Sequence, residues 1–352
     1  MAVPGAFDKA GPGRDAREVP PRVSVLLPAF EAEATLGAAL RSVERQSEAD
    51  FECVVVDDGS TDATREVAHA YARRDPRFRV LEEPHRGTVG ALLAGLEACR
   101  GEIVARMDAD DLMHRDRLRA QVALLDAQPE IAAAGCHVRI FPRTTMSDGM
   151  RDYESWLNAM RSPVDVRRDA LVECPVAHPS LAIRTHALRE HGYRALDWPE
   201  DWDLVLRMLA AGREIGVVPR RLLAWRDHPG RETRRAERCR PERFPPLRAA
   251  FLAEGLLAGV DEYVLWGYGH TGRALRRALA SLGKLPIAIV EMHPGRLGNR
   301  IHGAPVVPPE ALPGLPRRPI VASVAGPVAR GLIRERLDAL GFRELRDYAC
   351  AA

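Results

Sequence analysis

Two acidic turns follow short apolar runs early in the chain, and each could bind a charged ligand. The first is Val54-Val-Val-Asp-Asp-Gly-Ser-Thr-Asp62. In open α/β sheets, ligands bind beyond the carboxyl ends of the strands, so Asp58 could hydrogen-bond a base or a ribose there. Asp62 is better explained as the N-cap of the following helix. This turn is therefore a candidate nucleotide site.

The second acidic turn is Met107-Asp-Ala-Asp-Asp111. Alternating carboxylates suit a hard divalent cation that also holds phosphate oxygens. Acidic turns are common and usually solvated, so this motif alone is weak evidence. Its place at the end of another strand of the same expected sheet strengthens the interpretation as a metal site.

A third group of carboxylates lies in Trp198-Pro-Glu-Asp-Trp-Asp-Leu-Val-Leu-Arg207. Glu200 and Asp201 open an expected helix, and acidic residues favour the positive end of a helix dipole. The alternative is that one carboxylate reaches a cleft and acts as a general base. Trp198 and Trp202 could then form an apolar wall that shapes an acceptor pocket and raises the pKa of that base.

These turns need a scaffold, and the first 128 residues predict one in which strands alternate with helices. We expect strands at 23–27, 51–56, 78–81 and 102–107, and helices at 35–46, 62–73, 88–99 and 115–128. Continuous apolar strands between helices are typical of a mostly parallel sheet covered on both faces. The fold class is therefore α/β.

A second, smaller α/β unit begins near Tyr263. We expect strands at 263–266, 286–290 and 320–324 and helices at 273–282 and 331–340. Between the first strand and helix lies Gly267-Tyr-Gly-His-Thr-Gly272, which fits the context of the dinucleotide fingerprint, with Glu291 as the acidic ribose partner. The alternative is a tight strand-to-helix turn in an auxiliary or oligomerising domain. The unit is short for a complete dinucleotide-binding fold, and no catalytic companion is apparent.

A chain of 352 residues suggests about two domains. We predict a flexible tail at 1–21, a large α/β domain at 22–240, a linker and helix at 241–260 marked by Pro245-Pro246, and a Rossmann-like domain at 261–352. The tail has no apolar h-region, and no apolar run approaches the length of a bilayer span. We expect neither a signal peptide nor an anchor.

Charge and cysteine usage exclude some classes of function. The formal net charge of +2 argues against a nucleic-acid-binding protein. The six cysteines are dispersed without a CxxC pair, as is typical of a reducing cytoplasm. Between Gly212 and Arg248, however, 11 arginines face five acidic residues. That stretch is either a solvated surface or a contact with anionic lipid headgroups or a lipid-diphosphate acceptor, so we expect a cytoplasmic protein that could lie against the inner face of a membrane.

Together these motifs resemble the family 2 glycosyltransferases, which are inverting enzymes of the GT-A fold. The resemblance rests on Val-Ser-Val-Leu-Leu-Pro-Ala-Phe30 and on the three acidic motifs in order, and it covers roughly 22–235. Two further familial pieces are Val176-Ala-His-Pro-Ser-Leu-Ala-Ile183, expected as a strand that lines the cleft, and Trp225-Arg-Asp-His-Pro-Gly230, expected as a loop over the diphosphate. By itself, His178 is more simply explained as a packed core histidine.

The resemblance implies roles for individual residues. It implies that Ala29, Glu31 and Asp58 contact the nucleoside and that Asp108 contacts the ribose or the diphosphate. Asp110 and His228 would bind the metal, and Arg226 and His228 would bind the diphosphate. Asp201 would deprotonate the acceptor hydroxyl. One departure is that Phe30-Glu31 stands where many relatives carry Tyr-Asn, which removes a hydroxyl from base recognition.

The implied reaction moves a sugar from a nucleotide-diphospho-sugar, expected to be UDP-linked, to a saccharide or lipid-linked acceptor. Mn²⁺ or Mg²⁺ is the implied cofactor, and polysaccharide or glycolipid assembly is the implied context. Two alternatives remain open at this point. One is an NAD(P)-dependent oxidoreductase centred on the second glycine motif, and the other is a nucleotide-sugar-binding protein without transferase activity.

Overall fold

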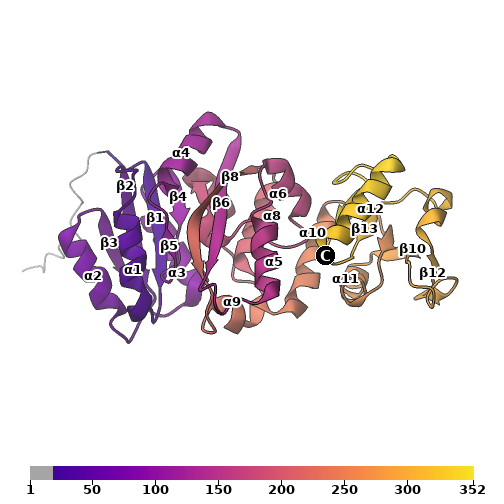
Figure 1. The fold of residues 1–352 in the computed structure, drawn as a ribbon, viewed down its shortest axis with the longest axis horizontal. Coiled ribbons are helices and arrows are strands. Elements are labelled where there is room, and N and C mark those ends of the chain that lie inside the picture. The colour runs from indigo at the N-terminus through magenta and orange to yellow at the C-terminus, as the bar shows by residue number, and fades with distance from the viewer. Residues whose placement is uncertain (1–18) are drawn as a thin grey trace, which may run out of the picture.

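The computed structural model describes residues 19–352, so the predicted tail at 1–21 lies almost entirely outside the described residues. The chain forms two sheets that follow one another along the long axis of the molecule (Figure 1). An eight-stranded sheet has the order β3-β2-β1-β4-β7-β6-β8-β5, and a six-stranded sheet has the order β11-β12-β10-β9-β13-β14. The predicted α/β class is confirmed in both.

The first half of the large sheet is parallel, as predicted. Its strands are β1 (Val23–Ala29), β2 (Phe51–Asp57), β3 (Phe78–Glu82) and β4 (Ile103–Arg106). β1 lies in the middle, parallel to β2 on one side and to β4 on the other. The connecting helices are α1 (Glu33–Glu44), α2 (Thr64–Arg74), α3 (Gly87–Ala98) and α4 (Arg117–Ala127).

The second half of the sheet mixes strand directions. It contains β5 (Leu112–Met113), β6 (Ile131–Phe141), β7 (Ala182–Arg184) and β8 (Glu214–Arg226). β7 runs antiparallel to both β4 and β6, while β8 runs parallel to β6 and antiparallel to β5. Around it lie α5 (Asp148–Leu157), α6 (Pro163–Asp169), η1 (His178–Ser180), α7 (Thr185–His191) and α8 (Glu200–Ala210).

Alternate side chains of the central strands fill two cores, one on each face of the sheet. Val25 and Leu27 of β1 pack with Leu36 and Leu40 of α1 on one face. Leu26, from the opposite side of the same strand, belongs to a second cluster with residues of α3 and α8. Burial on both faces is what continuous apolar strands predict, and it fixes the strand ends that carry the acidic turns.

Two sequence-based expectations about elements are wrong. Residues 176–183 do not form a strand: His178–Ser180 is a 3-10 helix, and only Ala182–Arg184 joins the sheet. Pro179 supplies no backbone N–H for a ladder, which favours the helical turn. Pro245 and Pro246 lie in the first turn of α10 (Phe244–Glu254) rather than in a linker, because a proline there costs no helical hydrogen bond.

The small sheet contains β9 (Glu262–Trp266), β10 (Leu285–Val290), β11 (Arg300–Ile301), β12 (Ala304–Val307), β13 (Ile320–Ala322) and β14 (Tyr348–Cys350). Its helices are α11 (His270–Ser281), η4 (Pro309–Gly314) and α12 (Pro327–Ala339). Counted along the chain, the five parallel strands lie in the order 3-2-1-4-5, which matches the first five strands of the doubly wound order 3-2-1-4-5-6.

The two sheets are joined by α10 and by contacts on residues 169–172. The Arg248 guanidinium of α10 donates to the carbonyl oxygens of Leu171 and Val172. Arg334 of α12 forms an ion pair with the buried carboxylate of Asp169, which also accepts a hydrogen bond from the Trp156 indole. Between β8 and α10, the chain passes through α9 (Glu232–Arg235), η2 (Glu237–Cys239) and η3 (Pro241–Arg243).

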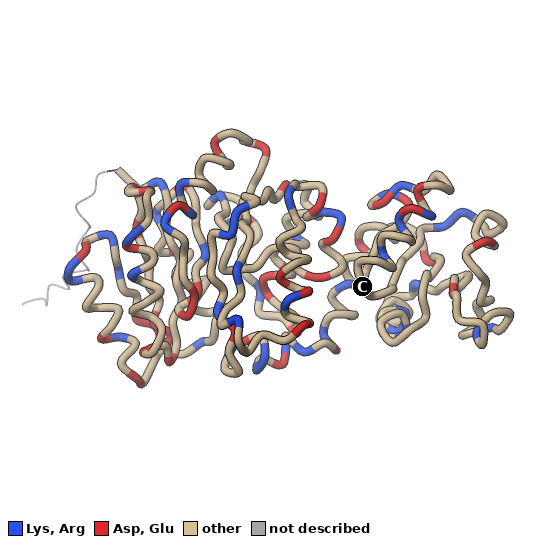
Figure 2. Tube along the Cα trace, viewed as in Figure 1, with Lys and Arg blue, Asp and Glu red and all other residues tan. Residues whose placement is uncertain are grey.

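Charged residues are interspersed along both parts of the chain rather than gathered by sign (Figure 2). Within residues 19–352, no helix combines the length and the apolar character needed to cross a membrane. The six cysteines, all of them in the described part of the chain, form no disulfide.

Candidate active site

An acidic cluster lies where β4 ends and the chain turns into β5. Oxygen atoms of Asp108, Asp110 and Asp111 all come within 4.8 Å of one another. The strand that follows the turn, β5, pairs with β8 and places Leu112 beside Ala224. This pairing fixes the position of the turn. Three carboxylates this close repel one another unless cations compensate them, so this turn is the strongest candidate for a metal centre.

Asp111 is the buried member of the cluster, with no exposed surface. Its Oδ1 accepts a hydrogen bond from the backbone N–H of Arg226 at 2.7 Å, while Oδ2 is buried and has no hydrogen-bond partner. Burial raises the pKa of Asp111 well above its usual value, and the charges of Asp108 and Asp110 raise it further. A buried carboxylate oxygen without a partner is costly and is available to coordinate a cation.

Asp110 is held from β8 and the loop that follows it. Asp110 Oδ2 lies 2.8 Å from Nε2 of His228, and its carbonyl oxygen accepts from Nε of Arg226 at 2.6 Å. Burial and the charge of Asp108 raise the pKa of Asp110, while the His228 hydrogen bond opposes the increase. The structure thus brings together Asp110, Arg226 and His228, three residues singled out from the sequence.

Asp108 completes the cluster through an ion pair that sequence reasoning missed. Asp108 Oδ1 lies 2.7 Å from the guanidinium of Arg106, the last residue of β4 and only 4% exposed. The carbonyl of Arg106 accepts a 2.9 Å hydrogen bond from the buried Arg117 of α4. A charged residue in a strand of apolar neighbours was the available signal for Arg106, because a buried arginine requires a specific anionic partner.

Asp201 lies on the first turn of α8, and burial raises its pKa to about 7. The charge of the adjacent Glu200 adds to the increase, and the charge of Arg106 opposes it. Asp201 Oδ1 accepts a hydrogen bond from its neighbour's backbone, Trp202 N–H, at 2.7 Å. A carboxylate with a pKa near neutrality can accept a proton at physiological pH, as a general base must.

The expected aromatic wall beside Asp201 is wrong for Trp202. This side chain is 1% exposed, donates its indole N–H to the carbonyl of Ala170, and packs edge-on against Phe244. Trp202 is therefore a core residue, packed between the end of α6 and α10. Trp198 is half-buried, and its indole N–H donates to Asp203 at 3.2 Å.

The expected nucleoside contacts lie at the ends of β1 and β2. The backbone N–H of Asp58 donates to the carbonyl of Ala29 at 2.9 Å. Glu31 has a positive φ of 48°, and its Oε1 accepts from the backbone N–H of Thr61 at 2.7 Å. β2, β1 and β4 are parallel neighbours, so Ala29, Asp58 and the acidic cluster share one edge of the sheet.

An aromatic pair at this edge was not foreseen from the sequence. The rings of Phe30 and His85 are stacked, with centroids 4.2 Å apart and planes at 25°. His85 Nδ1 lies 2.9 Å from Asp58 Oδ2, and Asp58 Oδ1 accepts from the backbone N–H of Arg86 at 2.8 Å. Phe30 remains 46% exposed, so part of its ring is accessible from solvent.

His178 is a core residue, as its lone position in an apolar segment suggested. It is 6% exposed, and its Nε2 lies 3.0 Å from the Tyr193 hydroxyl. Burial lowers the pKa of His178 well below its usual value, and the charge of Arg106 adds to the decrease. A neutral imidazole is therefore packed in the core against Tyr193.

The glycine turn after β9 has clear steric reasons for two of its glycines. A Cβ on Gly272 would lie 2.1 Å from the carbonyl oxygen of Gly267, and one on Gly267 would lie 2.4 Å from Val324. Glu291 is occupied locally: it accepts hydrogen bonds from the backbone N–H groups of Tyr268 and Met292, and its carboxylate lies 2.7 Å from Arg296. These contacts agree with a tight structural turn.

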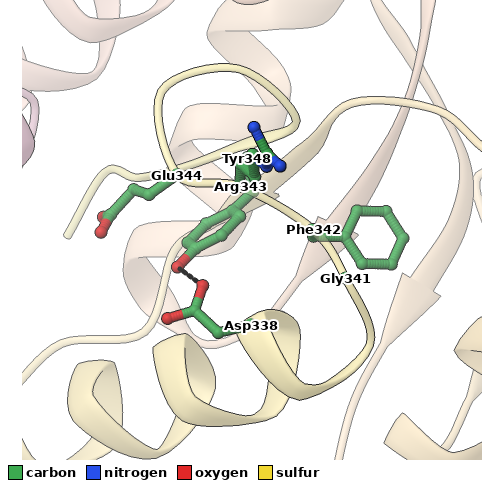
Figure 3. A pocket seen from close by; sticks show the side chains of 6 residues that line it. All are labelled: Asp338, Gly341, Phe342, Arg343, Glu344 and Tyr348. Atoms are coloured by element: carbon green, nitrogen blue, oxygen red, sulfur yellow. Dashed lines mark hydrogen bonds between the residues drawn. The ribbon is translucent and has the colours of Figure 1, made fainter.

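A surface pocket of about 510 Å³ lies in the C-terminal part of the chain, far from the sheet edge that carries Asp58 and the acidic cluster. It is lined by Asp338 near the end of α12, by the following loop at 341–344 and by Tyr348 at the start of β14, and the Tyr348 hydroxyl lies 3.1 Å from Asp338 (Figure 3). None of the sequence-predicted site residues contributes to it. The amino end of β14 is also the edge opposite to the glycine turn, so this pocket supports neither candidate site.

A family model described as glycosyl transferase family 2 matches residues 24–192. The putative glycosyltransferase EpsE of Bacillus subtilis is 30% identical over 201 residues, which cover 54% of this chain and 68% of EpsE. The amylovoran biosynthesis glycosyltransferase AmsE of Erwinia amylovora is 29% identical over 203 residues, covering 56% of this chain and 73% of AmsE. Three other curated glycosyltransferases are matched over only 26% to 54% of their length.

Solved structures support the GT-A fold. TarS 1–349 of S. aureus, crystallised in complex with UDP-GlcNAc, aligns with a TM-score of 0.54 and 18% identity over 73% of this chain and 71% of its own. The mannosyltransferase PcManGT of Pyrobaculum calidifontis, in complex with GDP-Man and Mn²⁺, aligns with a TM-score of 0.50 and 22% identity over 76% of this chain and 70% of its own. At these identities the likeness concerns the fold alone.

Proposed function

Because this chain belongs to glycosyltransferase family 2, we propose that it transfers a sugar from a nucleotide-diphosphate donor to an acceptor hydroxyl with inversion at the anomeric carbon. The observation that carries the proposal is the shared sheet edge. It places the Asp108–Asp110–Asp111 cluster beside the ends of β1 and β2, where Asp58 lies. A diphosphate beside the cluster and a nucleoside beside Asp58 fit the order of groups in such a donor.

The residues of the cluster fit a divalent cation. They offer only oxygen ligands, which suit Mg²⁺ and Mn²⁺, and the unpartnered buried Oδ2 of Asp111 supports their use as ligands. Asp110 and Asp111 would hold the ion, with His228 as a further ligand in place of its hydrogen bond to Asp110. Bound there, the ion would neutralise the charge that develops on a departing diphosphate.

The chain's own residues supply the remaining steps. Arg226, held by the carbonyl of Asp110 and stacked over Phe141, would bind phosphate oxygens through its guanidinium once the following loop adjusts. Asp201 would remove the proton from the acceptor hydroxyl, which becomes nucleophilic and attacks the anomeric carbon on the face opposite the diphosphate. No enzyme nucleophile is needed for this single displacement, so the configuration inverts.

Substrate class is proposed by association with relatives. AmsE is named for amylovoran biosynthesis, and another relative is an undecaprenyl-phosphate sugar transferase. We therefore propose a role in polysaccharide or glycolipid assembly, with a saccharide or lipid-linked acceptor. TarS with UDP-GlcNAc and PcManGT with GDP-Man and Mn²⁺ support a nucleotide-sugar donor. A UDP donor, a cytoplasmic location and peripheral contact with a membrane through the arginine-rich stretch belong to the same proposal.

A binding screen tests the proposal. Melting temperature would be measured with UDP, GDP, UDP-GlcNAc and GDP-Man, each with and without Mn²⁺, because a ligand that binds only the native state raises it. We expect stabilisation by one nucleotide class that depends on Mn²⁺. The same screen includes NAD⁺ and NADH, and stabilisation by these dinucleotides alone would contradict the proposal and favour an oxidoreductase.

A further inference from the structure

The segment that follows β8, residues 227–240, crosses from the donor side of the site to the helix that carries Asp201. We call it the strap. At its start His228 contacts Asp110. In its middle, Glu232 accepts a hydrogen bond from the hydroxyl of Thr88, in the first turn of α3. Near its end, Arg238 Nε lies 2.8 Å from Glu200 Oε2, on the first turn of α8.

Arg238 makes two ion pairs with one guanidinium. Its Nε binds Glu200, and its Nη2 binds the second carboxylate oxygen of Glu232. Glu200 is 7% exposed, and the side chain of Arg238 is 23% exposed. Thr88, Glu232, Arg238 and Glu200 therefore form a continuous chain of polar contacts that ends directly beside Asp201 in the sequence.

The planar guanidinium suits this place. It can present separate N–H groups to two carboxylates at fixed angles, whereas an ammonium group acts as a single point charge. Burial opposes the charge of Arg238, but Glu200 and then Glu232 hold its pKa above the usual value. Glu200 is nearly inaccessible to water. Arg106 also interacts with its charge but is paired with Asp108, so loss of Arg238 would leave the charge of Glu200 largely uncompensated.

We propose that Arg238 is a positioning residue for the base Asp201: it neutralises Glu200 beside the base and ties that carboxylate, through Glu232, to Thr88 of α3. The inference rests on the proposed function, because it takes Asp201 as the base. It adds a residue outside the acidic motifs, on the strap, that sets the electrostatic environment of the base.

The charged groups around Asp201 determine in which direction loss of Arg238 changes the pKa of Asp201. The titratable and charged side chains whose charges interact with Asp201 come from six elements or loops: Glu200, Arg106, Tyr153, Cys174, Tyr193 and Cys239. Arg106 is the cation among them, and it is already paired with Asp108. Loss of Arg238 therefore leaves the repulsion between Glu200 and Asp201 largely uncompensated, which raises the pKa of Asp201.

The test compares R238A, R238K and the double variant E200Q/R238A with the unmodified chain. R235A is the matched control, since Arg235 is an exposed arginine of the same strap. Two readouts are used: the pH dependence of sugar transfer, and a ¹³C NMR titration of aspartate carboxyl groups in which D201N identifies the Asp201 signal. Melting curves establish that each variant folds.

In R238A we expect the Asp201 titration and the acid limb of the rate profile to move to higher pH by about one unit, the order of an unscreened neighbouring charge. R238K should keep most of the unmodified profile, and E200Q/R238A should reverse the shift because no carboxylate remains to be neutralised. R235A should change neither readout. If R238A does not fold, R238M, which keeps the aliphatic stem without the charge, must show the same shift of both titrations to higher pH.

An unchanged Asp201 titration in folded R238A would overturn the inference. The same holds for a shift that persists in E200Q/R238A, because Glu200 would then not be the cause. The NMR readout does not depend on turnover. If the unmodified chain transfers no sugar while the R238A shift is present, the proposed function fails and the role of Arg238 in setting the Asp201 pKa stands.

Discussion

The imidazole of His228 contacts the carboxylate of Asp110 at 2.8 Å, although 118 positions separate the two residues in the sequence. The antiparallel pairing of β5 with β8 explains the contact, because Leu112 and Ala224 are register partners. The loop before β5 and the loop after β8 therefore meet at one end of this pair. A residue that the sequence places in a late loop thus becomes part of the acidic cluster.

Removal of cluster carboxylates should abolish metal-dependent nucleotide binding. We expect D110N and D111N to lose the Mn²⁺-dependent increase in melting temperature produced by UDP or GDP, because each removes an anionic oxygen ligand. EDTA should have the same effect on the unmodified chain. The solvated carboxylate of Asp148, which is exposed on α5, provides a control: D148N should keep the full Mn²⁺ response, and an unchanged response in D110N would exclude Asp110 as a ligand.

The Phe30–His85 pair should contribute to nucleotide binding. A stacked aromatic contact is worth about 0.5–1.5 kcal/mol, so F30A should weaken binding of the preferred nucleoside diphosphate by about three- to tenfold in calorimetry. H85A removes the ring that stacks on Phe30 and the contact to Asp58 Oδ2, while the backbone N–H of Arg86 still holds Asp58 Oδ1. F30Y is the matched control, since it keeps the ring, and it should bind at least as well as the unmodified chain. Equal affinities of F30A and F30Y would contradict a stacked base.

The raised pKa of Asp201 also predicts a pH-dependent cost in stability. Its folded-state value of about 7 exceeds that of an unfolded aspartate, roughly 3.9, so ionisation of Asp201 disfavours the folded state. The cost is absent below pH ~4 and grows as pH rises toward 7. D201N should therefore melt at a higher temperature than the unmodified chain at pH 8, by a few degrees, and the difference should shrink at pH 5. A difference that does not change between these two pH values would contradict the assignment.

Two variants of the glycine turn after β9 test whether packing alone explains its glycines. G272A should lower the melting temperature of the C-terminal part markedly, because its Cβ would lie 2.1 Å from the carbonyl oxygen of Gly267. G269A is the matched variant: Gly269 has φ of −72° and open space at its Cβ position. It should melt like the unmodified chain, and a large loss of stability in G269A would show that the turn is constrained by something besides packing.

Much of the fold could be predicted from periodicity. β1, β2 and β4 are continuous apolar runs, and the helices between them carry apolar stripes, so the first half of the large sheet and its acidic turns follow from local sequence. The antiparallel half could not be predicted in this way. β8 extends from Glu214 to Arg226 and contains Pro219 and two exposed arginines, and its place in the sheet depends on pairing with β6, which is distant in sequence.

The candidate site likewise contains residues that local sequence could indicate and residues that depend on tertiary contacts. Asp58 and Asp110 follow recognisable strand ends and Asp201 opens a recognisable helix, so the sequence alone could mark them as site candidates. His85 and Arg238 could not be marked in this way, because their contact partners, Asp58 and Glu200, lie 27 and 38 positions away in the sequence. Arg106 lies only two positions before its partner Asp108, and its signal, a charged residue inside an apolar strand, was overlooked. Asp111 lies within the acidic motif, but its burial becomes apparent only when β8 covers it.

The central claim is that Asp201 takes the proton from the acceptor, and sugar transfer by D201N tests it most directly. Transfer from the nucleotide sugar selected in the binding screen to polyprenyl-phosphate or polyprenyl-diphosphate-linked acceptors would be measured for D201N and the unmodified chain from pH 5 to 9. The account predicts an acid limb near pH 7 for the unmodified chain and a rate about 10²–10⁴-fold lower for D201N, with Mn²⁺-dependent nucleotide binding unchanged. Transfer by D201N at the unmodified rate, with the same pH profile, would contradict it.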